Sequence, residues 1–369
     1  MDDVVGDMLQ SDSRSMRTRR RKNTVDVDVP GLMIFRHDLH QQYYNLDRPH
    51  VFDLCKQGWH KLPRLSSYLP VHTMSTCVIT GGGGLLCLLD TCLPVVNRSL
   101  YICNPLTKRW RKLPSPPQLH PSYSVARRQT AVVVDEATKS YEIVLFVRSS
   151  ELGKTCSLVY FSASNSWRLQ ELDDPDMDIV SIMATNNKDG DSNTRLLLIL
   201  FGNCSTGRIG MGNFDVERSA WTHVAYIDTS SIGYHLDSYM MWYLRFTGAM
   251  VTCAGTLYLV VPWSIKRVFP CTWTIAILKI QEELTTTKAE RLTEVDVEFV
   301  STGDGNKLLP FASFAWESNG RHFIGMVDQR GFMLKYDVLS GVWSSCRIGR
   351  HDQIFVEANP YEASQLAEV

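Results

Sequence analysis

A six-residue step from an Asp or Asn to a Trp occurs four times along this chain. The four pairs share this spacing and lie far apart in the sequence: Asp53 and Trp59, Asn104 and Trp110, Asp215 and Trp221, and Asp337 and Trp343. A degenerate copy, with Tyr160, Phe161 and Ser162 before Trp167, lies between the second and the third. Self-similarity of this kind is typical of repeat architectures, in which each copy is one supersecondary unit. The repeat therefore predicts a chain of similar units and makes an enzyme less expected.

Each copy has the composition of a β-hairpin. In the clearest copy, the strand-forming run 100–102 precedes Asn104 and Pro105. Asp and Asn favour the first position of a tight turn because their side chains bond nearby backbone groups, and Pro presets the next backbone angle. The returning strand carries the Trp, whose ring we expect to pack against a neighbouring sheet while its N–H donates to a backbone acceptor. Chance tryptophans in turns would not explain four equal offsets.

The intervals between tryptophans indicate one sheet per repeat. Successive tryptophans from Trp59 to Trp221 are separated by 51, 57 and 54 residues, whereas 122 residues separate Trp221 from Trp343. The last interval is about twice the others, so one unit lacks its Trp. Units of about 50 residues are typical of kelch-type propeller blades.

We assign the missing unit to the apolar runs 256–261 and 275–280, and we expect its hairpin turn to be enlarged by the polar run 282–288. The predicted fold is therefore all-β: a kelch-type β-propeller of about six four-stranded blades over residues 31–361. Residues 362–369 are expected to form a C-terminal tail.

The composition is that of an ordinary soluble globular protein, with 44% hydrophobic and 21% charged residues. The net charge of −1 provides no long-range attraction to nucleic acid or to an anionic membrane, so neither is an expected partner. No two cysteines have the spacing of a zinc ribbon, and the N-terminus has no apolar signal segment. We expect thiols in a reducing compartment, a monomer, and a location in the cytoplasm, the nucleus or both.

Residues 1–30 differ from the rest of the chain. They are polar and contain too little apolar surface to offset the entropy of ordering, so we expect a disordered basic tail. Its basic residues form a candidate nuclear-import signal: Arg17, Arg19, Arg20, Arg21 and Lys22. A phosphate-contacting arm and a solvated tail with no targeting role are the alternatives.

No pattern in the sequence predicts a catalytic site. The histidines are scattered without a paired carboxylate that would complete a metal site, and no Gly-x-Ser-x-Gly motif occurs. The run 81–84 is four glycines, but no Lys-Ser/Thr follows to complete a phosphate loop, so it predicts a turn or bulge. We therefore expect no catalytic, metal-binding or cofactor-binding residues, and no enzyme.

Two segments are candidate partner-binding loops. The segments 232–243 and 262–270 are richer in aromatic residues, Met and Arg than a hairpin requires, and these residues are frequent at binding hot spots. The candidate residues are Tyr234, His235, Tyr239, Met241, Trp242, Trp263 and Arg267. The alternative is that these aromatic side chains pack between blades.

The segment 104–114 reads Asn-Pro-Leu-Thr-Lys-Arg-Trp-Arg-Lys-Leu-Pro and resembles a segment that closes an early blade in plant F-box/kelch-repeat proteins. The glycine-rich strand before it, the hairpin from Val133 to Phe146 and the final 359–361 also look like the F-box-associated region of that family. The resemblance covers about residues 31–361. It implies a kelch propeller that recruits a protein substrate to a Skp–cullin–F-box ubiquitin ligase.

The chain departs from that family at its N-terminus. The family carries an F-box of about fifty residues before the propeller, and residues 1–30 are too short and too polar to form one. A Skp-type adaptor is therefore expected as a partner only if an F-box lies upstream. A free-standing kelch scaffold without a ligase role is the first alternative, and a propeller enzyme of the copper radical oxidase type is the second.

Overall fold

The structure is a computed structural model. It describes residues 30–38, 49–70, 76–90, 99–117, 123–135, 137–149, 155–172, 177–185, 195–203, 206, 208–228, 249–266, 272–282, 287–298, 310–328, 331–348 and 353–362. The predicted tails, residues 1–30 and 362–369, and the nuclear-import candidates lie outside these ranges, except for Pro30 and Glu362, which belong to the first and the last strand. Within them, the chain forms 24 β-strands and a single short 3-10 helix, η1 (Leu65–Ser67).

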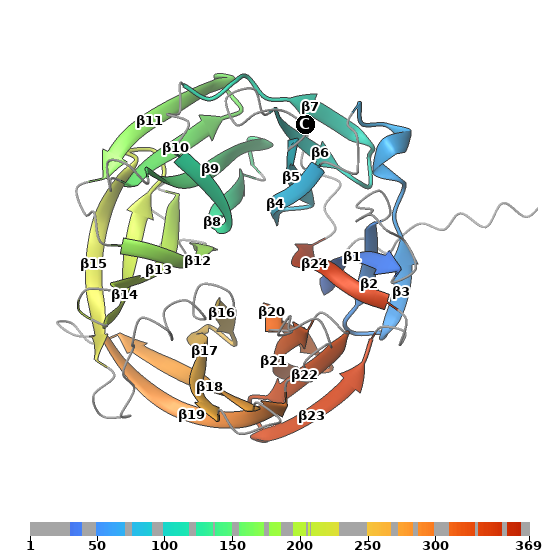
Figure 1. Ribbon diagram of the computed structural model, residues 1–369, viewed down its shortest axis with the longest axis vertical. Helices are drawn as coiled ribbons and strands as arrows, with labels where there is room; N and C mark the ends of the chain where they lie inside the picture. Colours follow the sequence, from blue (N-terminus) through green and yellow to red (C-terminus); the bar gives the residue numbers. More distant parts are fainter. Residues whose placement is uncertain are drawn as a thin grey trace, which may run out of the picture.

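The strands form antiparallel four-stranded sheets arranged in a ring, which we number as blades from the N-terminus (Figure 1). Blade 1 consists of β24 (Gln353–Glu362), β1 (Pro30–Asp38), β2 (Pro49–Asp53) and β3 (Gly58–Lys61), from the centre outwards. Blade 2 consists of β4 (Thr76–Gly82), β5 (Leu85–Asp90), β6 (Leu100–Asn104) and β7 (Arg109–Lys112). Blade 3 consists of β8 (Tyr123–Asp135), β9 (Ser140–Ser149), β10 (Thr155–Phe161) and β11 (Ser166–Leu172).

The second half of the ring repeats this order. Blade 4 consists of β12 (Met177–Thr185), β13 (Leu196–Asn203), β14 (Arg208–Asp215) and β15 (Ala220–Asp228). Blade 5 consists of β16 (Ala249–Cys253), β17 (Thr256–Lys266), β18 (Thr272–Glu282) and β19 (Thr287–Glu298). Blade 6 consists of β20 (Pro310–Ser318), β21 (Arg321–Asp328), β22 (Phe332–Asp337) and β23 (Val342–Arg347). The prediction of an all-β propeller is confirmed.

The two ends of the described chain close the ring. Strand β24 supplies the innermost strand of blade 1 and pairs antiparallel with β1, from Pro30 opposite Glu362 to Asp38 opposite Gln353 (Figure 1). A register shift between Phe35 and Arg36 bends this pair. Because backbone hydrogen bonds join the first blade to the last strand, the ring is held shut without a covalent link.

The hydrophobic core lies between blades, because each sheet buries both faces. In β9, Val144 and Phe146 pack toward blade 4, whereas Ile143 and Leu145 pack toward blade 2. Side chains alternate between faces along a strand, so one strand contributes to two interfaces. A cluster of buried apolar residues of this kind fills each of the six junctions between neighbouring blades.

The Asp and Asn residues of the repeat start tight turns, as predicted. The Oδ1 atom of Asn104 accepts the backbone N–H groups of Leu106 at 3.0 Å and Thr107 at 3.2 Å. The Oδ1 atoms of Asp53 and Asp337 accept two backbone N–H groups in the same way, and that of Asp215 accepts the N–H of Arg218. The residue four positions later has a positive φ in five blades: Gln57, Lys108, Asn165, Ser219 and Gly341. Only one of these is Gly, so the positive φ could not be predicted from the residue type.

The tryptophans of the repeat face the preceding blade, but the partner of the indole N–H differs from one to the next. The Nε1–H of Trp59 donates to the Ile348 carbonyl at 3.0 Å, and that of Trp167 donates to the Pro114 carbonyl at 2.8 Å. Trp343 donates to the hydroxyl of Thr293 at 2.9 Å rather than to backbone. The indole N–H of Trp221 is buried with no partner, so the predicted backbone acceptor is wrong for these last two.

Blade 5 is the unit that lacks a Trp at the repeat position, although its strands hold Trp263 and Trp273, and it lies where the sequence places it. Ala289 pairs with Ile280 as Trp59 pairs with Phe52, and both Ala289 and Ile280 are buried against blade 4. The expected enlargement of the hairpin is only partly right. The connection 283–286 has four residues, as in the other blades, and the ladder is longer by one residue pair.

The outermost strands of blades 4 and 5 touch beside this alanine. Ile227 and Asp228 of β15 pair in parallel with Thr287 and Lys288 of β19, which merges the two blades into one eight-stranded sheet (Figure 1). A large indole at position 289 would lie between these strands. We infer that the small side chain of Ala289 allows the two backbones to approach within hydrogen-bonding distance.

Two smaller predictions concern glycines and cysteines. Gly83 and Gly84 have φ values of +53° and +78° and form the turn between β4 and β5, as predicted for the glycine run. Of the cysteines whose environment is described, four are buried and none forms a disulfide, and burial raises the pKa of the Cys103 thiol to about 12. Cys346 is half-buried, and the side chain of Cys55 is exposed. Among the described residues, no helix is long and apolar enough to cross a membrane.

Candidate functional site

Two hollows open on the same face of the ring. Because strands within a blade are antiparallel, the hairpin joining the first two strands and the hairpin joining the last two lie at the same end of each blade. We call this end the turn face; it carries the turns 54–57, 83–84 and 319–320. One hollow lies beside the turn 135–140 of blade 3, and the other lies between blades 6 and 1.

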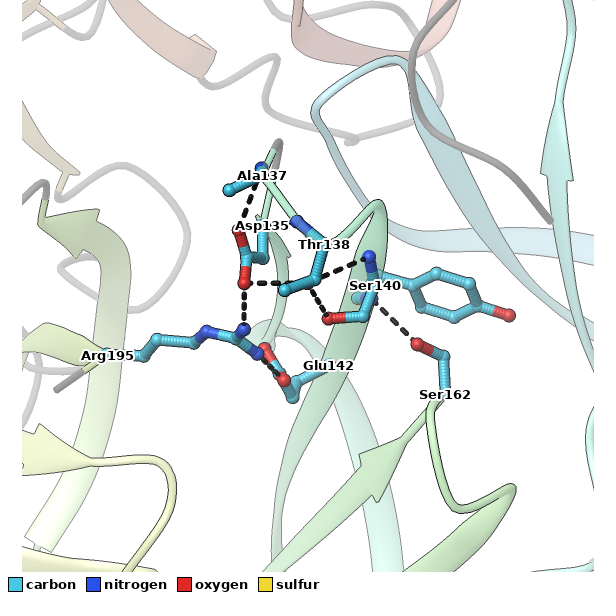
Figure 2. Close-up of polar contacts among 8 residues, drawn as sticks. Asp135, Ala137, Thr138, Ser140, Glu142, Ser162 and Arg195 are labelled. Carbon is cyan, nitrogen blue, oxygen red and sulfur yellow. Dashed lines mark hydrogen bonds and ion pairs between the residues drawn. The ribbon is translucent and has the colours of Figure 1, made fainter. Parts of the chain in front are cut away.

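The first, the Arg195 hollow, has a volume of about 500 Å³ and is built around the turn between β8 and β9. Arg195 precedes β13 of blade 4, and its backbone carbonyl accepts the N–H of Val216 at 3.0 Å. From this anchored position its guanidinium reaches across to blade 3, where it pairs with the carboxylates of Asp135 and Glu142 (Figure 2). The arginine therefore ties two blades together.

The hydroxyl groups of the turn organise the Asp135 carboxylate. Thr138 Oγ1 donates to Asp135 Oδ2 at 2.7 Å, and the backbone N–H groups of Ala137 and Thr138 donate to Oδ1 (Figure 2). These bonds, with the Thr138 hydroxyl the largest influence and the charge of Arg195 adding to them, hold the pKa of Asp135 below its usual value. The carboxylate is thus ionised and already paired.

The remaining polar groups of this hollow do not converge on a reacting centre. Glu142 is 5% exposed, and its Oε2 atom is buried without a partner. The hydroxyl of Tyr141 is likewise buried, and burial raises the pKa of its phenol. Alternate residues of β9 point to opposite faces, so Tyr141 lies toward blade 2 while Glu142 lies toward blade 4. Since its arginine is already bound to two carboxylates, we interpret this hollow as an inter-blade tie.

The second, the closure hollow, has a volume of about 350 Å³ and lies where the ring closes. Its floor continues the apolar core between blades 6 and 1. The rings of Trp316 and Phe323 stack with centroids 5.1 Å apart, and Leu54 and Met333 complete the floor. A Cβ atom on Gly325 would stand 2.6 Å from Cζ3 of Trp316, so the indole lies flat on the sheet only because position 325 has no side chain.

Cationic and neutral polar groups form the wall of the closure hollow. Lys335 of β22 holds its ammonium 4.8 Å from the centroid of the Phe323 ring. Arg321 of β21 is largely exposed, and its Nη1 lies 3.5 Å from Asp337 Oδ2. The Cys55 thiol donates to the carbonyl of Glu317 at 3.6 Å and so joins the two sides of the hollow. The polar side chains of Gln57, Ser318 and Asn319 complete the wall.

The predicted partner-binding residues are not among the described residues that line either hollow. Tyr234, His235, Tyr239, Met241, Trp242 and Arg267 fall in 229–248 and 267–271, outside the described residues. Trp263 belongs to β17, and its side chain is not described. The structure therefore leaves these candidates as predictions.

Sequence reasoning missed the closure hollow. Arg321 and Phe323 are two residues apart in β21, and Met333 and Lys335 are two residues apart in β22. Since residues two apart in a strand share a face, both pairs point to one face of blade 6. That pattern is visible in the sequence. Their proximity to the turn 54–57 is not, because about 260 residues separate the two segments. In the part of the chain that is described, no group of three or more His, Cys, Asp or Glu side chains could hold a metal ion.

The fold just described is that of a β-propeller. No protein-family model matches the chain, and no curated protein matches it in sequence. Among solved structures, it is similar to the propeller of Dos1, with a TM-score of 0.42 and 9% identity over 84% of this chain and 66% of that one. It is also similar to an α-L-arabinofuranosidase from Fusarium graminearum, with a TM-score of 0.44 and 10% identity over 86% of this chain and 85% of that one.

A third similar structure is an exo-β-1,3-galactanase from Phanerochaete chrysosporium, with a TM-score of 0.40 and 11% identity over 75% of this chain and 66% of that one. This chain spans about two thirds of the length of the galactanase and of the Dos1 chain. At such identities the likeness concerns the fold alone. The activities of these proteins are therefore no guide to the activity of this chain.

Proposed function

We propose that this protein is a binding module for another protein, built on a kelch-type propeller. The observation that carries the proposal is the closure hollow, a small cavity with an aromatic floor and a polar, cationic wall on a rigid scaffold. Cavities that combine apolar side chains with a few placed polar groups are the usual form of a binding site. A rim of short turns on a packed ring holds such groups in place without a cost of ordering them on binding.

We further propose that the captured protein is recruited to a Skp–cullin–F-box ubiquitin ligase. Support for this step is the resemblance of residues 104–114 to plant F-box/kelch-repeat proteins, together with the blade length of about 50 residues. In such an assembly the propeller supplies substrate recognition and an F-box supplies the contact to the adaptor. The site of action would be the cytoplasm, the nucleus or both.

Co-precipitation with a Skp-type adaptor tests the ligase step. The chain of 369 residues and a version extended by the upstream reading frame are each incubated with purified adaptor. We expect the extended version to retain the adaptor and the shorter one not to. If neither version binds, the ligase role is wrong and the protein is a free-standing scaffold, which is the second candidate.

The candidate loop 232–243 can be tested separately. Substitution of Tyr234, Tyr239 and Trp242 by Ala is expected to weaken capture of partners while the urea unfolding midpoint stays unchanged. A large drop in that midpoint would show instead that these side chains pack between blades. The two outcomes distinguish a contact surface from a core.

A further inference from the structure

We propose that the closure hollow binds a short acidic segment of the partner protein, with one Asp or Glu carboxylate in the hollow and an apolar side chain next to it. This inference rests on the proposed function, because it names the chemistry of the partner that the propeller captures. The charge of the wall, the aromatic floor and the size of the cavity all favour such a ligand.

The charge of the wall favours a carboxylate. Lys335 and Arg321 project from neighbouring strands of blade 6, and no acidic side chain is among the ten described residues that line the hollow. Asp337, the acidic neighbour of Arg321, uses its Oδ1 atom for the backbone N–H groups of Leu339 and Ser340. A guanidinium has five N–H donors, so a single 3.5 Å contact to Asp337 Oδ2 leaves donors for a ligand.

The position of Lys335 connects the charge to the floor. Its ammonium lies 4.8 Å from the centroid of the Phe323 ring, which keeps the charge beside the aromatic surface rather than in open solvent. A carboxylate that reaches this ammonium must therefore lie next to the apolar floor. A residue adjacent to that carboxylate can place an apolar side chain against the parts of Trp316 and Phe323 that line the hollow.

The size and the rim of the cavity favour a peptide. A volume of about 350 Å³ accommodates one or two side chains but not the surface of a folded domain. Gln57, Ser318 and Asn319 offer amide and hydroxyl groups that both donate and accept hydrogen bonds. A peptide backbone presents N–H and C=O groups to pair with them, whereas a free phosphate or sulfate presents acceptors alone.

Three peptide libraries test the proposal. Each holds short peptides randomised on both sides of one fixed residue, which is Glu, Gln or phosphoserine, and each is passed over the immobilised protein. We expect the Glu library to be retained with enrichment of an apolar residue next to the Glu. Equal retention of the Gln library, or retention of the phosphoserine library alone, would overturn the proposal.

Matched variants locate the site. A fluorescent peptide enriched from the Glu library should bind Lys335→Gln and Arg321→Gln about tenfold more weakly than the wild type, because each variant loses a charge-assisted bond. Lys139→Gln removes an exposed cation elsewhere on the turn face and should bind normally. Each variant should unfold at the wild-type urea concentration. Unchanged binding by both hollow variants contradicts the proposal.

Peptide binding and adaptor binding are separate measurements. If the hollow binds no acidic peptide but the extended chain retains the adaptor, the ligase role stands and the hollow is not the recognition site. If the peptide binds and the adaptor does not, the hollow is a recognition site on a free-standing scaffold. In the second case, added salt should weaken peptide binding, because the contact is ionic.

Discussion

The indole N–H of Trp59 donates a 3.0 Å hydrogen bond to the carbonyl oxygen of Ile348, which lies 289 residues further along the chain. Trp59 belongs to the outermost strand of blade 1, and Ile348 follows the outermost strand of blade 6. The ring also closes near its centre, where the last strand, β24, pairs with β1 inside blade 1. The closure therefore consists of a strand pair within blade 1 and of contacts between blades 6 and 1, and the closure hollow lies at that junction of the two blades.

Replacement of Trp59 by Phe should lower the free energy of unfolding by about 1–3 kcal/mol, because the ring shrinks and the Ile348 carbonyl loses its donor. Urea denaturation followed by circular dichroism measures the change. Trp110→Phe is the matched control, since Trp110 has the same place in its repeat but is 39% exposed. We expect that variant to change stability by less than about 0.5 kcal/mol. Equal losses for the two variants would contradict the role of the hydrogen bond.

Replacement of Asn104 by Ala should destabilise the protein by about 1–3 kcal/mol. Asn104 is fully buried, and the change removes the acceptor of the Leu106 and Thr107 N–H groups. Asn104→Asp keeps that acceptor and reproduces the residue used in three other blades, so its loss should be smaller. Thermal unfolding of the two variants compares them. An Asp variant as unstable as the Ala variant would refute the turn as the cause.

Acid should reduce the contribution of the Asp135 carboxylate to the stability of the folded protein. Its pKa is lowered in the folded protein, mainly because the Thr138 hydroxyl donates to the carboxylate. A depressed folded pKa means that the stabilisation is present above the unfolded pKa of about 4 and is lost as the pH falls through the folded value. Thr138→Val should therefore be less stable than the wild type at neutral pH, and the difference should shrink at about pH 3.

Urea midpoints at the two pH values measure this effect. Ser164→Ala is a suitable control, because the Ser164 hydroxyl lies on the neighbouring turn and bonds to the hydroxyl of Ser166 rather than to a carboxylate. Its difference from the wild type should not depend on pH. A Thr138→Val difference that grew in acid would show that the sign of the Asp135 contribution is wrong.

Introduction of the repeat Trp into blade 5 should destabilise the protein. Ala289 is 4% exposed and surrounded by the core between blades 4 and 5, so a Trp there would overpack the junction and separate β15 from β19. We expect Ala289→Trp to cost about 1–3 kcal/mol in urea denaturation. Leu292→Trp adds the same ring in the same strand at a position that is 37% exposed, and should be nearly neutral. A more stable Ala289→Trp variant would disprove the role of the small side chain.

The parts of the fold that depend on neighbours in sequence were predictable. The turn after Asn104 follows from an Asn-Pro pair, and the turn after Gly82 follows from two glycines that adopt positive φ. The unit that lacks the repeat Trp was found from spacing alone, since a repeat of constant length leaves a gap of two repeat lengths where one Trp is missing. The spacing did not indicate that the hairpin between β18 and β19 of blade 5 keeps a four-residue connection and has a longer ladder of paired residues.

The candidate site was less predictable. Aromatic content pointed to the loop around Trp242, which lies outside the described residues, and it gave no sign of the hollow lined by Trp316, Phe323 and Lys335. In sequence these three residues belong to ordinary alternating strands. They become a site because the turn at Cys55 lies against them, and nothing in the local pattern of either segment predicts that contact.

The sequence by itself determined the repeated hairpins, their tight turns and the number of units, because turn chemistry and strand alternation act over a few residues. The tertiary structure decided which residues of different blades meet. Trp59 reaches Ile348 and Cys55 reaches Glu317 only once the ring has closed, whereas Arg195 reaches Glu142 when blades 3 and 4 pack together. These contacts arise from the packing of whole sheets against one another, so the hollow belongs to the closed ring rather than to any single repeat.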